Sequence, residues 1–432
     1  MMLSLLAKMK IKGLSLVSLH LLAIVILVPL QARAEPVVEV MHWMYRGSDA
    51  RAMRVLIDEF ESKGGIWHNV AGKTSVDVLN SAVSRMAKGY APTFVQWNSA
   101  WEVAQIRKLG LLNEVGKELS ESLENTLIEN VLDMVKVDNE IVSVPINVHT
   151  ENWLWYRKQN EALIAPDVFT KWANFLKYAK GLHEENRYAL AVGNEPWQIR
   201  ALFNNILLGE TNQQMYESIY NKLDTSVFQE KKFKDALQVF INLKQFSHSF
   251  GDGRWDQQVA AVAASRATAL VTGDWAKGEF KKLGLKLGRD YECLLAPGTN
   301  DNIVLTIDAF VLGQVVSDSE KEGQKLLVDV VTDPDVSETF NYLKGSFPPI
   351  KGIGIDSLDH CNQQAYAMLN QKGKAIKAYA NTGDRGFLAN LDHLISELWN
   401  GNLEIDEWIE EFTSALDSER DKRNESYRVS GK

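Results

Sequence analysis

Apolar and polar positions along the chain follow two spacings, which predicts an α/β protein. The predicted strands cover residues 37–43, 93–97, 142–148, 153–156, 188–192, 303–307 and 310–312. The predicted helices cover residues 53–60, 76–86 and 172–179, much of the eighty residues after 192, and most of the chain from about 317. Strands that alternate with helices favour a largely parallel sheet. Because the rhythm restarts near residue 148, the pattern indicates two α/β lobes.

The first 34 residues have the three parts of a cleavable export signal. Basic residues come first, an apolar run follows from Leu14 to Leu30, and Ala32-Arg33-Ala34 supplies the small residues that signal peptidase needs. The alternative is a permanent membrane anchor, but His20 and Pro29 weaken the run for that role. We therefore expect cleavage after Ala34 and a soluble periplasmic protein. The sequence near this point has no cysteine, so we expect no lipid on the new N-terminus.

The composition is that of an ordinary globular protein, and its charge excludes some partners. The chain has 432 residues and a net charge of -9, which the loss of four basic residues with the signal would take to -13. An acidic chain is not expected to bind nucleic acid. Two cysteines are too few for an ordinary structural zinc site. An oxidising compartment favours a disulfide between Cys293 and Cys361 over two unrelated buried thiols.

Motifs for catalysis and for metal binding are not recognisable in the sequence. Gly72-Lys73-Thr74 resembles the end of a phosphate-binding loop, but Trp67 stands where that motif needs a glycine. His183-Glu184 lacks the second histidine of a zinc protease, because Arg187 occupies that position. The histidines are scattered without metal-ligand spacing. We therefore expect a protein that is not an enzyme and that has no metal or cofactor.

Tryptophans beside polar turns are the strongest functional signal. Trp43, Trp97, Trp197 and Trp275 each lie at a predicted strand end or next to Gly, Asn or Asp residues. In open α/β sheets, ligands bind beyond the strand ends. An aromatic face surrounded by carboxylates and amides suits a sugar, because each buried hydroxyl without a partner costs about 1–3 kcal/mol. The alternative is that these tryptophans are core or rim residues.

Five motifs, in order, resemble the extracellular solute-binding proteins of ABC sugar importers, in the glucose/mannose-binding branch related to maltose-binding protein. The motifs are His149-Thr150-Glu151-Asn152-Trp153-Leu154-Trp155-Tyr156, Gly273-Asp274-Trp275-Ala276-Lys277-Gly278-Glu279-Phe280, Ala296-Pro297-Gly298-Thr299, Ile307-Asp308-Ala309-Phe310 and Phe340-Asn341-Tyr342-Leu343-Lys344-Gly345-Ser346. The resemblance covers essentially the whole chain after the signal.

The resemblance implies a type II periplasmic-binding-protein-like fold, with two lobes, three crossovers and a ligand cleft between the lobes. The N-terminal lobe would comprise residues 35–147 plus 303–332. The C-terminal lobe would comprise residues 148–302 plus 333–432. The implied partners are a small saccharide and a membrane permease, and the expected state is a monomer.

The resemblance also implies which residues bind the ligand. The implied set is Trp43, Asp49, Trp97, His149, Glu195, Trp197, Trp275, Asp308 and Lys344. In this reading Trp275 stacks on the sugar ring. The structural alternatives are that His149 only braces the hinge and that Asp274 only caps a helix. The chain departs from many relatives at Trp43-Met44, where they have two tryptophans, and this difference affects which sugar is bound.

Two other functions fit parts of the same pattern. An exported carbohydrate-active enzyme that uses an Asp/Glu pair in the cleft would explain the export signal and the tryptophans. It would not explain five motifs in order. A binding protein that delivers its ligand to a membrane sensor is the other alternative, and the sequence does not distinguish it from a transport protein.

Overall fold

The computed structural model describes residues 34–158, 164–165, 167–379, 383 and 385–430. The predicted export signal, residues 1–34, lies outside these ranges except for Ala34. Within the described residues, no helix has both the length and the apolar character that crossing a membrane requires. Residues 35–432 form one compact unit.

The first of two five-stranded sheets is built mainly from the N-terminal third of the chain. Its strand order is β2-β1-β3-β14-β6. The bounds are β1 Val37–His42, β2 Ile66–Ala71, β3 Phe94–Trp97, β6 Val144–Pro145 and β14 Ala309–Leu312. The neighbours β2, β1 and β3 are parallel, whereas β14 is antiparallel to both β3 and β6. The expectation of a largely parallel sheet therefore holds only for the first part, because β14 enters directly from the second half of the chain instead of through a helical crossover.

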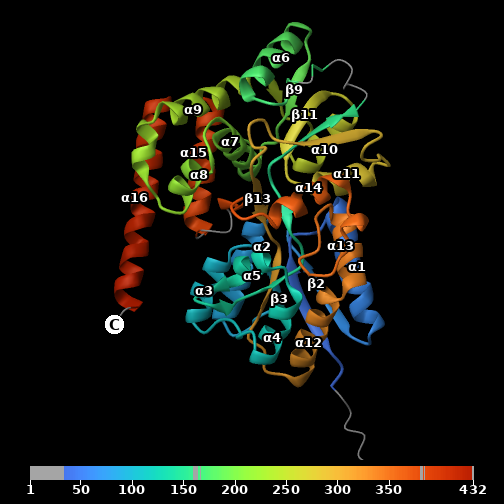
Figure 1. Cartoon of the computed structure of the whole chain (residues 1–432). Coiled ribbons are helices and arrows are strands. Elements are labelled where there is room, and N and C mark those ends of the chain that lie inside the picture. The colour runs from blue at the N-terminus through green and yellow to red at the C-terminus, as the bar shows by residue number, and fades with distance from the viewer. Residues whose placement is uncertain (1–33, 159–163, 166, 380–382, 384, 431–432) are drawn as a thin grey trace, which may run out of the picture. The chain divides into compact units, whose positions relative to one another are not determined.

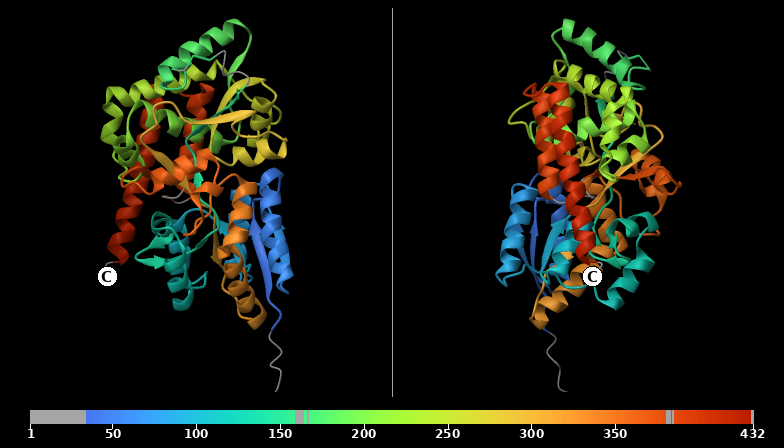
Figure 2. Two further views of the ribbon diagram at one scale, coloured as in Figure 1. Left: turned by 45° about the vertical axis from the view of Figure 1, so that its right-hand side comes forward. Right: turned by 90° about the vertical axis from the view of Figure 1, so that its left-hand side faces the viewer.

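Helices pack on both sides of this sheet. Their bounds are α1 Gly47–Ser62, α2 Ser75–Ala87, α3 Ala100–Lys108, α4 Lys117–Thr126, α5 Glu129–Val135, α12 Asp318–Thr332 and α13 Pro334–Lys344. The apolar residues of α1 at helical spacing, such as Met53, Leu56 and Phe60, are its buried residues, which confirms that predicted helix. In Figures 1 and 2, α1, α12 and α13 lie side by side, and α13 packs against both other helices. A small hairpin, β4 Lys136–Val137 with β5 Glu140–Ile141, follows α5.

The second five-stranded sheet has the order β10-β9-β11-β8-β12. Its strands are β8 Trp153–Arg157, β9 Tyr188–Ala191, β10 Ser247–His248, β11 Ala267–Thr272 and β12 Tyr291–Leu295. It is also mixed, because β8 is antiparallel to β11 and to β12. The helical elements after β8 and before β13 are α6 Trp172–Glu184, α7 Pro196–Glu210, α8 Gln213–Tyr220, η2 Thr225–Gln229, α9 Lys231–Lys244, α10 Trp255–Ala263 and α11 Ala276–Lys282. The C-terminal helices α15 Arg385–Asn400 and α16 Ile405–Ser430 pack against each other, and α15 also packs against α7 and α9 (Figure 1).

A third, three-stranded sheet has the order β15-β13-β7 and joins segments that are far apart in the sequence. Its strands are β7 His149–Thr150, β13 Ile303–Thr306 and β15 Ala375–Lys377, and the last is preceded by η3 Ile355–Ser357 and α14 His360–Leu369. Here β13 is antiparallel to β7 and parallel to β15. The chain passes from β7 into β8 of the second sheet and from β13 into β14 of the first sheet. The third sheet therefore holds side by side two of the segments that connect the two larger sheets.

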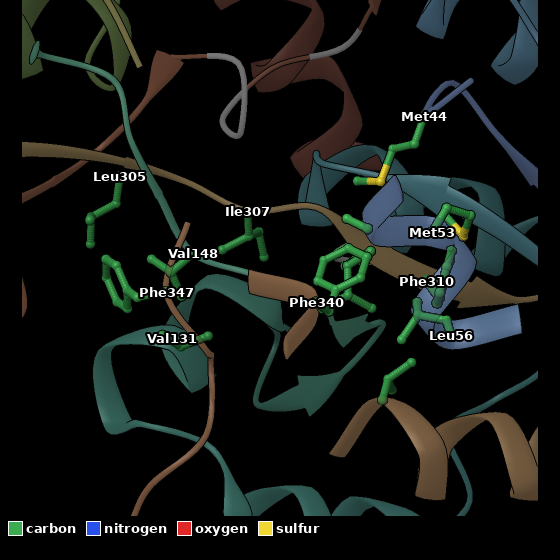
Figure 3. Packing of buried hydrophobic residues seen from close by; sticks show 14 of the residues in the cluster. Met44, Met53, Leu56, Val131, Val148, Leu305, Ile307, Phe310, Phe340 and Phe347 are labelled. Carbon is green, nitrogen blue, oxygen red and sulfur yellow. The ribbon is translucent and has the colours of Figure 1, made fainter. Parts of the chain in front are cut away.

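One apolar cluster extends from the first sheet to these connections. Figure 3 shows Leu56, Phe310 and Phe340 in one part of it, and Val148 and Phe347 in another. The cluster also includes residues of the second sheet, while a separate cluster fills the space among β8, β9 and the helices α6, α7, α9, α15 and α16. The polar residues described next lie where the three sheets approach one another.

Candidate functional site

Asp308 is a buried carboxylate between the end of β13 and the start of β14. Gln96 Nε2 donates to its Oδ1 at 2.9 Å, and Asn147 Nδ2 donates to its Oδ2 at 2.8 Å. The backbone N–H of Asp308 in turn donates to Asn147 Oδ1 at 2.8 Å. Burial by itself would raise the pKa of Asp308, but hydrogen bonding with His149 and the charge of Lys344 outweigh it and hold that pKa well below its usual range. The site therefore keeps a fixed negative charge at this point.

His149, in β7, lies between two carboxylates and is 3% exposed. Its Nδ1 contacts Asp274 Oδ1, and its Nε2 lies 3.6 Å from Asp308 Oδ2. Asp274 Oδ2 also accepts from the backbone N–H of Thr150 at 3.0 Å. Burial would lower the pKa of His149, but the two carboxylates outweigh it, so the pKa is raised and the imidazolium is favoured. Asp274 therefore takes part in a side-chain network with His149. The structural alternative given from the sequence was that Asp274 only caps a helix.

Lys344 ends α13 and forms an ion pair with Asp49 in the first turn of α1. Its Nζ donates to Asp49 Oδ1 at 2.8 Å. Gly345 follows with φ +98°, a left-handed conformation that stops the helix and that glycine adopts without strain. Burial would lower the pKa of Lys344, but Asp49 and Asp308 outweigh it and raise the pKa. A fixed ammonium group therefore lies beside two carboxylates.

Trp275 lies next to this network and just before α11. Its ring centroid is 5.3 Å from that of His149 at an interplanar angle of 85°, and 5.9 Å from that of Trp197 at 66°. Edge contacts of this kind fix the orientation of the indole. The Trp275 Nε1 atom is buried and has no hydrogen-bond partner among the described residues. A buried donor without a partner is costly, so an acceptor brought within reach of this N–H would offset that cost.

Glu195 and Trp197 lie on either side of Pro196, the first residue of α7. Gln198 Nε2 donates to Glu195 Oε2 at 2.7 Å. Burial raises the pKa of Glu195, although hydrogen bonds from Gln198 and Trp197 oppose that effect. Through the contact between Trp197 and Trp275, this turn joins the same group of side chains.

Trp43 and Trp97 have different places in the structure. The backbone N–H of Trp43 donates to Gln96 Oε1 at 3.1 Å, so Trp43 is one residue removed from the carboxylate network. Trp97 follows Gln96 in β3, and neighbouring residues in a strand point to opposite faces. The Trp97 indole N–H donates to Glu102 Oε2 at 2.8 Å, and Arg385 lies over its ring. The contacts described for the Trp97 side chain are thus with Glu102, Arg385 and the apolar core.

Two further sets of contacts link segments that the sequence keeps far apart. Arg385, at the start of α15, donates from Nε to Glu102 Oε1 at 2.6 Å. At the start of α1, the backbone N–H of Ser48 donates to Glu279 Oε2 at 3.3 Å, and Arg51 Nη2 donates to the backbone oxygen of Gly278 at 3.2 Å. The first set joins α15 to α3, and the second joins α1 to α11. In each set, one helix lies in the part of the chain that surrounds the first sheet and the other in the part that surrounds the second.

The structure thus brings Asp49, His149, Asp308, Lys344 and Trp275 into one network and links Glu195, Trp197 and Trp43 to it. Sequence reasoning missed two members, Gln96 and Asn147. The signal for Gln96 was an uncharged polar side chain inside an otherwise apolar strand. Asn147 lay at an expected crossover, but its pairing with Asp308 is 161 residues distant in sequence, which no local pattern indicates.

Two α/β lobes, with charged, amide and indole groups gathered where their sheets meet, define the class of two-lobed solute-binding proteins. Residues 55–356 match the family described as bacterial extracellular solute-binding proteins, and the chain belongs to that family. A probable sugar-binding periplasmic protein of Rhizobium meliloti (strain 1021) is 27% identical over 397 residues, covering 90% of this chain and 95% of that protein. A protein of the same description from Brucella suis biovar 1 (strain 1330) is 26% identical over 390 residues, covering 88% of this chain and 92% of that protein.

Solved structures share the two-lobed fold at low sequence identity. A chitin oligosaccharide binding protein matches with a TM-score of 0.76 and 17% identity, over 89% of this chain and 98% of that one. A Streptococcus pneumoniae solute-binding protein in complex with the blood group A-trisaccharide matches with a TM-score of 0.66 and 20% identity, over 88% of this chain and all of that one. The expected type II periplasmic-binding-protein-like fold is therefore confirmed. The disulfide expected between Cys293 and Cys361 is also present.

Proposed function

We propose that this solute-binding protein is a periplasmic sugar receptor, which captures a mono- or small oligosaccharide between its lobes and delivers it to an ABC transporter permease. The observation that carries the proposal is the network of Asp49, Asp308, Lys344 and His149 next to Trp275, whose buried N–H has no partner in the part of the chain that the structure describes. Fixed acceptors, a fixed donor and an aromatic ring are the groups that sugar hydroxyls and C–H faces need. The relatives named above, described as probable sugar-binding proteins, support this choice of ligand.

The residues of the network would have separate roles. Trp275 stacks on the sugar ring, Asp49 and Asp308 accept hydrogen bonds from hydroxyls, and Lys344 donates one. His149 holds Asp308 and Trp275 in position. Trp43, Glu195 and Trp197 would complete the pocket wall, whereas Trp97, which is 1% exposed and contacts Glu102 and Arg385, would support that wall from the core side. Binding needs no cofactor and no chemical step, so the protein would not be an enzyme.

The lobe boundaries are part of the proposal. The N-terminal lobe would comprise residues 35–147 plus 303–344, and the C-terminal lobe would comprise residues 148–302 plus 345–432. Packing of α13 against α1 and α12 favours a third crossover that comes after Lys344 instead of near residue 333. A ligand that contacts both lobes would favour a closed arrangement, because it binds that arrangement more tightly than an open one.

Export and partners follow from the same function. Residues 1–34 would be removed as a signal peptide after Ala34, leaving a monomer without a lipid anchor in the periplasm. The permease, and no nucleic acid, would be its macromolecular partner. Delivery to a membrane sensor instead of a permease predicts the same binding behaviour.

Isothermal titration calorimetry tests the proposal. Protein freed of ligand by unfolding and refolding is titrated with glucose, mannose, galactose and small disaccharides. We expect one sugar to bind with one-to-one stoichiometry and without being consumed. Trp275→Ala should weaken binding at least about tenfold, since stacking and a hydrogen bond together exceed about 1.4 kcal/mol, while Tyr90→Ala, at an aromatic residue 72% exposed, should not. Heat that continues as the sugar is consumed would favour the carbohydrate-active enzyme.

A further inference from the structure

The Cys293–Cys361 disulfide is surrounded by other groups that can bind a metal ion. Glu292 and Cys293 are neighbours in β12, and His360 and Cys361 are the first two residues of α14. The two sulfurs, a nitrogen of His360 and an oxygen of Glu292 all lie within 4.8 Å of one another. His360 Nε2 is 2.5 Å from Glu292 Oε1. The four side chains thus converge on one point from β12 and α14, whose cysteines are 68 residues apart in the sequence.

We propose that, when this disulfide is reduced, Glu292, Cys293, His360 and Cys361 form a binding site for a thiophilic divalent cation such as Zn²⁺. Two thiolates, one imidazole and one carboxylate are all groups that bind Zn²⁺, and four of them complete a tetrahedral site. The site is separate from the network around Asp308, so the inference goes beyond the proposed sugar binding.

The burial of the four groups suits a metal site that opens to solvent. Cys293 and Cys361 are buried, Glu292 is 16% exposed at its side chain, and His360 is 53% exposed. The sulfurs would hold the ion from the protein side, and the exposed imidazole would close over it. In a tetrahedral zinc site the two sulfurs lie about 3.7 Å apart, which is shorter than the 6.4 Å between the two Cα atoms.

Neighbouring groups position Glu292 and favour the thiolate of Cys361. Lys158 Nζ lies 3.5 Å from Glu292 Oε2 and orients that carboxylate while leaving Oε1 toward His360. Outer contacts of this kind fix metal ligands in place. Cys361 lies in the first turn of α14, a helix of ten residues, where the helix dipole favours a thiolate over a thiol.

The redox step is a two-electron exchange with a dithiol reductant. One dithiol gives two electrons and two protons to the Cys293–Cys361 bond and becomes a disulfide itself, and the protein is left with two thiols. Binding of the cation then releases the two thiol protons to solvent. The two cysteines therefore link β12 to α14 in two mutually exclusive ways, covalently when oxidised and, together with Glu292 and His360, through the metal when reduced.

Titration with Co²⁺ under nitrogen tests the proposal. The folded protein is reduced with dithiothreitol, freed of it by gel filtration, and titrated while sulfur-to-cobalt charge-transfer bands and the visible bands of tetrahedral Co²⁺ are recorded. We expect one Co²⁺ per reduced chain, displaced by Zn²⁺, and no such bands from the oxidised protein. Equal binding by the oxidised protein, or no stoichiometric binding by the reduced one, overturns the proposal.

Variants that keep both cysteines separate a built site from a simple pair of thiols. His360→Ala should weaken Co²⁺ binding by more than the 10- to 100-fold that loss of an outer-shell contact costs. His393→Ala removes an exposed histidine of α15 and should leave the affinity unchanged. An unchanged affinity in His360→Ala overturns the proposal. Near-ultraviolet circular dichroism reports folding, and a spectrum that is lost on reduction and not restored by Co²⁺ also overturns it.

Discussion

Removing the disulfide should lower the free energy of unfolding by an amount set mainly by the length of the loop that it closes. The bond joins Cys293 to Cys361 across 68 residues. For a loop of that length, the entropy of closure corresponds to about 4.4 kcal/mol at about 25 °C. The enclosed segment contains the strands β13 and β14, which belong to different sheets, and the helices α12 and α13. Reducing the freedom of this segment in the unfolded chain therefore stabilises the fold across both lobes.

Urea unfolding of Cys293→Ala/Cys361→Ala beside the oxidised wild type measures this loss. Both side chains are buried, and alanine leaves no polar group without a partner, so we expect a loss of about 4 kcal/mol within the usual range of about 2–5 kcal/mol. Each single variant breaks the same bond and should lose a similar amount. Midpoints and slopes that match those of the wild type would refute the reasoning.

Three further predictions concern the polar network and the contacts between helices. Burial alone would lower the pKa of His149, but its carboxylate partners raise it, so its stabilising effect is complete below about pH 6.5 and is lost as pH rises through the folded value. The difference in urea midpoint between wild type and His149→Gln should therefore shrink as the pH rises above about 6.5, and a constant difference would contradict this. Gly278→Ala would place a Cβ 2.6 Å and 2.7 Å from two backbone oxygens at the end of α13. It should therefore lower the free energy of unfolding, measured by thermal unfolding, by about 1–3 kcal/mol. Gly181→Ala, inside α6 with open space around it, should instead raise that free energy by about 0.5–1 kcal/mol. Arg385→Gln removes the guanidinium from Glu102 and should lower the free energy of unfolding by about 1–3 kcal/mol. Arg385→Lys keeps a positive charge and should recover part of that loss. Equal melting temperatures for wild type and Arg385→Gln would show that this contact contributes nothing to stability.

The sequence was a good guide to elements whose periodicity is strong. The strand at 37–43 and the helix at 53–60 lie where β1 and α1 do, because each has one clearly buried side. The strand β2 was not predicted, since Ile66–Ala71 is an edge strand and Trp67 is its one buried residue. The place of β14 between β3 and β6 was beyond any local pattern, because strand order depends on pairings across more than a hundred residues.

The candidate site was predictable in part. Polar turns beside tryptophans directed attention to Trp275 and Trp197, which the structure places in contact. Asp308 and Lys344 were singled out only through the resemblance to sugar-binding proteins, since an isolated aspartate or lysine carries no pattern of its own. The histidines gave no metal-ligand spacing along the chain, yet His360 lies beside both cysteines because it precedes Cys361, which the disulfide joins to Cys293 in β12. Convergence of this kind is a property of the tertiary fold.

The position of β14 also determines when the chain can fold. The first sheet needs Ala309–Leu312 between β3 and β6, so it stays incomplete until roughly three quarters of the chain has been synthesised. Contacts between such distant segments make folding slow, because the ordering of a long loop precedes the energy gained from its pairing. Fragments that stop before this strand have an open sheet edge and an uncovered apolar surface. Slow completion would keep the newly made chain unfolded for longer, which would suit the export proposed above.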